Sequence, residues 1–198
     1  MTEDIKQAYS KRASEYVAAL GSVEDMEPLD VALIASWGTK VVGSTLDVGS
    51  GPGHWTELLR NHGCDVSGID VVPEFVDSAR KRFPLASFEV GDLLVLPFEN
   101  ARFGGVLAWY SLIHMRPELC KQAFEELARV LKPGGDLLVG AFLGPQGVPF
   151  NHAITEAFYW SEQGLADSLD SAGFKVNSTH TRSAESSRPH LAVLARRR

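Results

Sequence analysis

The chain has 198 residues, of which 44% are hydrophobic and 22% are charged, so it can bury the core of a single globular domain. Its formal net charge of -6 disfavours a surface that binds nucleic acid, and its two cysteines, Cys64 and Cys120, have the spacing of neither a disulfide framework nor a zinc site, so we expect no metal. No apolar run approaches the roughly 18 residues that span a bilayer, and the N-terminus is charged where a signal peptide is apolar, so we expect a cytoplasmic protein without membrane contact.

Residues 1–40 are expected to form a helical cover, and residues 41–198 the core of the same domain. Within the cover, apolar and aromatic residues recur every three or four positions, which puts them on one stripe of a helix. The stripe contains Ile5, Tyr9, Arg12 and Tyr16. An arginine between two tyrosines has two explanations. Its stem can lie along the apolar face while its charge reaches water, or it can pair with a ligand in the core.

Beyond residue 40, short β-rich runs alternate with amphipathic stretches, as in a chain of βαβ crossovers that builds a parallel sheet. The expected strands cover residues 41–49, 64–71, 87–91, 104–111, 135–142, 174–182 and 189–196. A helix over residues 117–131 has one apolar stripe and should end before Pro133. Six residues separate the last two strands, too few for a helical crossover, so these strands should form an antiparallel hairpin.

The stretch LDVGSGPGHWT, residues 46–56, places three glycines where the first strand turns into a helix. Without a Cβ atom, a glycine turn lets a ligand lie against the backbone, close to the unpaired N–H groups of the helix start. A tight connection without a ligand would use the same residues. The third position of a dinucleotide-binding turn holds His54 here, where a ring would crowd the helix, so the sequence disfavours a dinucleotide.

Two carboxylates follow the next two strands. Asp70 ends the second strand and Asp92 comes directly after the third. Because parallel strands end at one edge of the sheet, both should lie near the glycine turn, where an acidic side chain can accept hydrogen bonds from ribose hydroxyls. The three features together predict a nucleoside site.

At this point several motifs, taken in order, resemble those of class I S-adenosylmethionine-dependent methyltransferases over about residues 40–195. They are LDVGSGPG, GID (68–70), GDLLVLPF (91–98), GGVLAWYSLIHM (104–115) and LKPGGDLLV (131–139). The resemblance implies an α/β fold with a Rossmann-like, doubly wound, seven-stranded sheet, mostly parallel and closed by a C-terminal antiparallel hairpin strand. It also implies S-adenosyl-L-methionine as cofactor and S-adenosyl-L-homocysteine as product.

The resemblance further implies a cofactor-binding role for particular residues. The methionine end would be lined by Gly49, Ser50, Gly51 and Gly53, the ribose held by Asp70, and the adenine placed by Val71, Asp92 and Leu93. Trp109 and Tyr110 would wall the site near the sulfonium, with core packing as the alternative. On the chemistry of the N-terminal stripe, Arg12 would pair with the cofactor carboxylate while Tyr9 and Tyr16 wall the methyl-transfer pocket.

Methyl transfer from a sulfonium depends mainly on alignment of the reactants, so a catalytic base is not required. The best candidate base is His114, shortly after the fourth strand, although it can equally be a histidine that leads into the next helix. His54, His152 and Tyr9 are weaker candidates.

The acceptor is expected to be a small molecule. The fourth strand ends in AWYS and lacks the Asn/Asp-Pro-Pro-aromatic motif of family members that methylate adenine or glutamine amides. Residues 1–40 and 143–153 can enclose a small acceptor, as in the quinone-biosynthesis type that the chain resembles. Two alternatives stay open, a non-catalytic module that binds S-adenosylmethionine or a nucleoside, and an NAD-dependent oxidoreductase. The sequence does not predict the oligomeric state.

Overall fold

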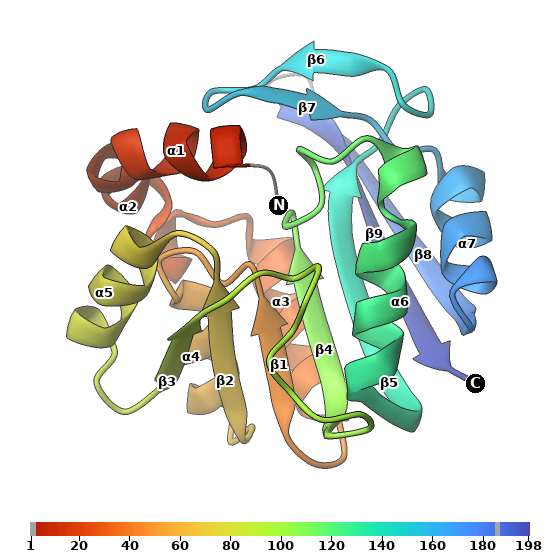
Figure 1. Ribbon diagram of the computed structural model, residues 1–198, viewed down its shortest axis with the longest axis horizontal. Helices are drawn as coiled ribbons and strands as arrows, with labels where there is room; N and C mark the ends of the chain where they lie inside the picture. The colour runs from red at the N-terminus through yellow and green to blue at the C-terminus, as the bar shows by residue number, and fades with distance from the viewer. Residues whose placement is uncertain (1–2, 185–186) are drawn as a thin grey trace.

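The computed structural model describes residues 3–184 and 187–198, and one seven-stranded sheet forms their centre (Figure 1). The strands are β1 (Thr45–Val48), β2 (Val66–Asp70), β3 (Ser87–Val90), β4 (Phe103–Trp109), β5 (Leu131–Phe142), β8 (Phe174–Ala184) and β9 (Ser187–Arg197). They lie in the order β3-β2-β1-β4-β5-β9-β8. Strands β1 to β5 are parallel, and β9 is antiparallel to both β5 and β8. The expected sheet and its C-terminal hairpin are confirmed.

Helices cover both faces of this sheet, which explains why every residue of β4 is buried. Helices α3 (Pro28–Gly38) and α4 (His54–Asn61) contribute to a core cluster on one face. Helices α6 (Lys121–Val130) and α7 (Glu162–Ser171) contribute to the larger cluster on the other face. Short 3₁₀ turns occupy Val23–Asp25 and Pro117–Leu119. No helix within the described ranges is long and apolar enough to cross a membrane.

The N-terminal cover lies above the carboxyl ends of the parallel strands and differs from the single helix that the sequence predicts (Figure 1). It forms two short helices, α1 (Glu3–Lys11) and α2 (Ala13–Leu20), because Arg12 leaves helical geometry, with φ -117° and ψ 14°. Both helices pack against α5 (Pro73–Arg82) through a cluster that includes Tyr9, Tyr16 and Phe75.

A second difference is a small antiparallel sheet of β6 (Pro149–Asn151) and β7 (Glu156–Phe158), where the sequence predicts only a covering loop. It lies at the same edge of the main sheet as α1 (Figure 1). Element ends also shift. The expected helix 117–131 begins as a 3₁₀ turn, and β5 starts directly at Leu131, earlier than expected.

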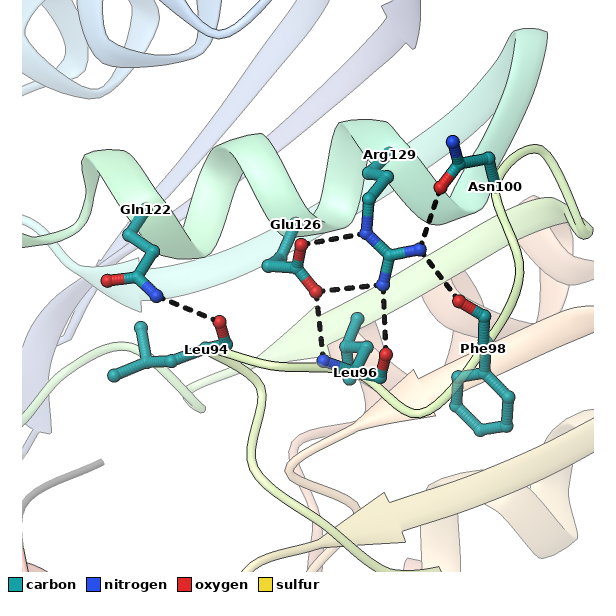
Figure 2. Close-up of polar contacts among 7 residues, drawn as sticks. All are labelled: Leu94, Leu96, Phe98, Asn100, Gln122, Glu126 and Arg129. Atoms are coloured by element: carbon teal, nitrogen blue, oxygen red, sulfur yellow. Dashed lines mark hydrogen bonds and ion pairs between the residues drawn. The ribbon is translucent and has the colours of Figure 1, made fainter.

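The segment after β3, which carries Asp92, is fixed to α6 by polar contacts (Figure 2). The Arg129 guanidinium donates to the carbonyl oxygens of Leu96 at 2.9 Å and Phe98 at 2.7 Å, and it pairs with Glu126. The Glu126 carboxylate in turn accepts a hydrogen bond from the backbone N–H of Leu96 at 2.9 Å. These contacts set the course of an otherwise irregular segment toward the carboxyl edge of the sheet.

We expect Arg129→Ala to lower the free energy of unfolding by about 1–3 kcal/mol, because two carbonyl groups and one carboxylate lose a charged donor. For a chain of this length, that loss corresponds to a fall in Tm of roughly 2–12 °C. Lys121→Ala on the same helix removes only an exposed pair with Glu125 and should change Tm by less than about 2 °C. Equal shifts for both variants in a thermal melt would contradict this role of Arg129.

Candidate active site

Two adjoining cavities open at the carboxyl edge of the parallel strands, beneath the N-terminal helices. The first has a volume of about 60 Å³ and is lined by residues that include Asp70, Val71, Phe75 and His114. The second, of about 240 Å³, is lined by residues that include Asp30, Ser50, Trp55 and Phe142. The two cavities share Tyr9, Tyr16, Gly49, Gly51, Trp109 and Tyr110 in their walls. Most of the expected site residues therefore meet here.

The glycines of the turn between β1 and α4 serve different purposes. Gly51 has φ +52°, and a Cβ atom built there would meet no atom within 4 Å, so the turn leaves open space beside both cavities. Gly53 has φ +87°, and a Cβ atom there would come within 2.7 Å of Phe88. Gly53 thus permits close packing of the helix and lies outside the lining of both cavities. Its predicted contact with the cofactor stays a prediction.

Asp70 ends β2, is 8% exposed and lines the first cavity. Its Oδ2 accepts a hydrogen bond from the backbone N–H of Gly51 at 2.8 Å, and its Oδ1 accepts one from Val72 at 2.8 Å. Burial raises the pKa of Asp70 to about 6, although the backbone N–H donors act in the opposite direction. The carboxylate therefore fixes the glycine turn, and its remaining acceptor capacity can serve a ligand hydroxyl.

Asp92 and Leu93 lie outside the lining of both cavities. The Asp92 Oδ1 accepts a hydrogen bond from the backbone N–H of Leu94 at 2.9 Å, and Leu93 is 4% exposed within the main core. Their predicted contacts with adenine stay predictions. Ser50 does line the second cavity, and its buried Oγ has no hydrogen-bond partner among the described residues.

The residues of the N-terminal stripe do not all reach the cavities in the structure. The rings of Tyr9 and Tyr16 lie 5.6 Å apart and line both cavities. Arg12 lies in the break between α1 and α2, where its side chain is 46% exposed. It pairs with Glu15 at 3.0 Å and donates to the backbone carbonyl of Ala153. The structure therefore brings the tyrosines to the cavities and leaves Arg12 outside them, and the pairing of Arg12 with a ligand carboxylate stays a prediction.

His114 lines the first cavity, but its ring nitrogens already have partners. Its Nδ1 lies 2.7 Å from the Glu156 carbonyl oxygen, which can only accept, so this nitrogen carries the proton. Its Nε2 then accepts from the Tyr9 hydroxyl at 2.7 Å. Burial lowers the pKa of His114, so the ring is neutral near pH 7. His114 can take a proton from a ligand only through Tyr9.

The other two histidines named from the sequence line the second cavity. Burial lowers the pKa of His54 to about 4, and neither of its ring nitrogens has a hydrogen-bond partner in the described part of the chain. Burial also lowers the pKa of His152 to about 4. Both rings are therefore neutral near pH 7.

Several cavity residues were not identified from the sequence. Asp30 is 7% exposed and pairs with Arg182, which lies far along the chain in β8. Phe75 and Phe142 read as ordinary core residues of a helix and a strand. No local pattern distinguishes these three, because only the folded chain brings them to one edge of the sheet.

Comparison with known proteins gives a family for part of the chain. Residues 45–135 match a family described as "Methyltransferase domain". A demethylmenaquinone methyltransferase of Renibacterium salmoninarum is 34% identical over 111 residues, which is 56% of this chain and 46% of that protein. The chain spans about half or less of the length of such curated relatives.

Two solved structures share the fold. A Burkholderia thailandensis 1,6-didemethyltoxoflavin-N1-methyltransferase, solved with bound 1,6-didemethyltoxoflavin and S-adenosylhomocysteine, has a TM-score of 0.78 and 20% identity, covering 98% of this chain and 87% of that one. The [4+2]-cyclase SpnF has a TM-score of 0.80 and 20% identity, covering 98% and 94%. Since the same fold carries two activities, the fold alone does not assign one. The matched domain, the ordered motifs and the order of the sheet are those of class I S-adenosylmethionine-dependent methyltransferases.

Proposed function

We propose that the chain transfers a methyl group from S-adenosyl-L-methionine to a small molecule, with S-adenosyl-L-homocysteine as product. The observation that carries the proposal is the cradle beside the glycine turn. There, Gly51 leaves open space, and the buried Asp70 carboxylate lies next to it in a cavity wall. A nucleoside needs this combination of close backbone approach and a buried hydrogen-bond acceptor for its hydroxyl groups.

The residues at the two cavities fit such a cofactor, which when bound supplies an electrophilic methyl group. Asp70 would accept hydrogen bonds from the ribose, and Val71 would pack on the adenine. Tyr9 and Tyr16 would close the site from above and exclude water. Roles for Asp92 and Leu93 at the adenine, and for Arg12 at the carboxylate, rest on the sequence resemblance and chemistry alone.

A small acceptor fits the cover of the site. The second cavity, about 240 Å³, is closed by residues from the N-terminal helices and from the β6 region, among them Leu20, Met26 and His152. These short elements leave little room for a folded macromolecule. Two similar proteins carry names that refer to a demethylmenaquinone and a didemethyltoxoflavin. Within this site, Tyr9 and His114 form one hydrogen-bonded pair that can orient an acceptor or receive its proton.

The affinity for S-adenosylhomocysteine should depend on pH through Asp70. The raised pKa, about 6, means that the carboxyl group binds a proton in the free protein at a pH where an exposed aspartate is ionised. Ribose hydroxyls donate to the ionised form, so affinity should rise with pH and be about tenfold higher near pH 8 than near pH 5. Calorimetry across this range measures the slope, and Asp70→Asn should remove it. An unchanged slope in the variant would assign the pH dependence to another group.

The function is tested in two steps. At a concentration 100 times its Kd, S-adenosylhomocysteine should add ~2.7 kcal/mol of stability, seen as a rise in Tm of roughly 5–11 °C, while NAD should give none. Methyl-labelled S-adenosylmethionine with a panel of small hydroxyl, amine and carbon acceptors then tests turnover. Binding without transfer to any acceptor would favour the non-catalytic module, and stabilisation by NAD would favour the oxidoreductase.

A further inference from the structure

The second cavity has a polar wall that the cofactor cradle does not explain. We propose that this cavity binds a planar aromatic molecule that carries a hydroxyl group. The ligand hydroxyl donates a hydrogen bond to the oxygen of Tyr110, whose side chain is held by His190 and, through it, by Asp30. The inference rests on the proposed methyl transfer and names the class of acceptor. It assigns Tyr110 direct contact with the acceptor and His190 a position behind Tyr110, while Asp30, which also lines the cavity, holds His190.

Tyr110 follows β4 directly and lines both cavities. Its φ of 56° lies in the left-handed region, which costs a residue with a side chain roughly 1–2 kcal/mol. Its backbone N–H donates to the Gly140 carbonyl at 3.0 Å, so the strained turn is anchored to β5. Strain of this kind at a cavity wall points to a side chain that is held in place for function.

A chain of polar contacts extends from Tyr110 to side chains of three elements, β9, α3 and β8. The Tyr110 hydroxyl hydrogen-bonds with Nδ1 of His190 in β9, and His190 Nε2 lies 3.7 Å from Oδ1 of Asp30 in α3. The Asp30 carboxylate also accepts hydrogen bonds from two N–H groups of Arg182 in β8, at 2.5 and 3.2 Å. His190 is 4% exposed and Asp30 7%. Burying such groups lowers stability unless they are paired, so their convergence on one cavity residue calls for a function.

The position of Asp30 determines the direction of the hydrogen bond at Tyr110. At 3.7 Å, His190 Nε2 makes no hydrogen bond with Asp30, but a carboxylate this close still favours the proton on the nearer nitrogen. We therefore assign the proton to Nε2, which leaves a free lone pair on Nδ1. The Tyr110 hydroxyl therefore donates to Nδ1. Its oxygen then accepts, and a ligand beside it must donate. The wall selects a hydroxyl or N–H group and disfavours a bare carbonyl or ether oxygen.

The rest of the cavity favours a flat apolar ligand. Aromatic rings of Tyr9, Tyr16, Trp55, Trp109 and Phe142 form much of its wall. Rings prefer other rings at their faces and edges. The volume of about 240 Å³ exceeds the roughly 150 Å³ cavity known to hold benzene. Because the glycine turn at one side of this cavity belongs to the cofactor cradle, the remaining space fits a single ring. A phenol-type hydroxyl combines this shape with the donor that Tyr110 requires.

The arrangement also provides a place for the proton that the acceptor hydroxyl loses during methyl transfer. A bond forms between the acceptor oxygen and the methyl carbon, while the carbon–sulfur bond of the donor breaks and its electron pair returns to sulfur. The acceptor proton passes to the Tyr110 oxygen as the Tyr110 proton passes to His190 Nδ1. The positive charge of the sulfonium is thereby replaced by that of an imidazolium beside Asp30. Tyr110, Asp30, Arg182 and Glu27 are the charged or titratable groups acting on this ring.

The test compares two probes that differ in one donor, 4-hydroxybenzonitrile and 4-methoxybenzonitrile, by calorimetry on the protein saturated with S-adenosylhomocysteine. Tyr110→Phe should weaken binding of the phenol about three- to tenfold and leave the ether unchanged. Tyr159→Phe is the matched control, since Tyr159 packs on Phe150 outside both cavities, and it should affect neither probe.

Two changes at His190 separate this direction of bonding from a packing role. His190→Asn keeps an oxygen near the place of Nδ1, so the preference for the phenol should survive, whereas His190→Leu should remove it. Nitrogen-15 NMR of labelled histidine should show His190 protonated at Nε2 and bare at Nδ1.

The opposite tautomer, equal losses for both probes in Tyr110→Phe, or no binding of the phenol to the wild-type complex would overturn the assignment. Failure of S-adenosylhomocysteine itself to bind would instead contradict the proposed function.

Discussion

Gly51→Val is expected to abolish binding of S-adenosylhomocysteine while the chain stays folded. The Cβ atom would enter the space beside both cavities and would meet no atom within 4 Å beyond its chain neighbours, so it would take the place of the ligand. We expect affinity to fall by at least about a hundredfold, or ~2.7 kcal/mol. The positive φ of +52° adds roughly 1–2 kcal/mol of backbone strain, which lowers stability but not below folding. Calorimetry and circular dichroism on one sample measure both effects.

Gly134→Val provides the matched control for this variant. Gly134 also has a positive φ, +75°, and open space around its Cβ position, but it lies near the start of β5, away from both cavities. Its substitution should cost similar stability and leave affinity for S-adenosylhomocysteine within about twofold of wild type. If Gly51→Val retained tight binding, the turn would be only a connection between β1 and α4.

Asp70→Asn is expected to weaken S-adenosylhomocysteine about ten- to a hundredfold. The asparagine has nearly the same shape, but it loses the charge and one of the two oxygens that accept from Gly51 and Val72. Charge-assisted hydrogen bonds to a ligand contribute ~1.5–3 kcal/mol, which sets this range. Because burial opposes ionisation of Asp70, removing its charge should not unfold the chain.

A ligand lacking one ribose hydroxyl tests the contact itself. Asp70→Asn should cost adenosine more affinity than 2′-deoxyadenosine, since the latter has lost one of the two groups that donate to the carboxylate. Asp136→Asn, on β5 and paired with Arg196, should change neither ligand. Equal losses for adenosine and 2′-deoxyadenosine would mean that Asp70 acts only by holding the glycine turn.

Features with a local cause were predictable from the sequence. The glycine turn and Asp70 belong to short segments whose geometry the neighbouring residues determine, and β1 and β2 pair in register beside each other. The C-terminal hairpin followed from the length of its connection. The N-terminal cover was harder, because the stripe of Tyr9 and Tyr16 depends on helical spacing and the chain leaves that spacing at Arg12.

Features that depend on distant contacts were not predictable. Asp30 and His190 meet near Tyr110 only after the sheet has brought α3 and β9 together. Nε2 of His114 is hydrogen-bonded to Tyr9, which lies 105 residues earlier in the chain. The sequence around His114 therefore could not show that this nitrogen already has a partner. Asp92 shows the same limit, since the irregular segment that carries it takes its course from α6 (Figure 2).

The claim that the cofactor occupies the cradle at the glycine turn is tested most directly by backbone amide NMR during titration with S-adenosylhomocysteine. We predict that the amide signals of Gly49, Gly51 and Val72 shift on binding, because the first two line the cavity and both Gly51 and Val72 donate to Asp70. The signal of Gly134 should stay in place. Saturable shifts that spare Gly51 and Val72, or no shifts at all, would contradict the account.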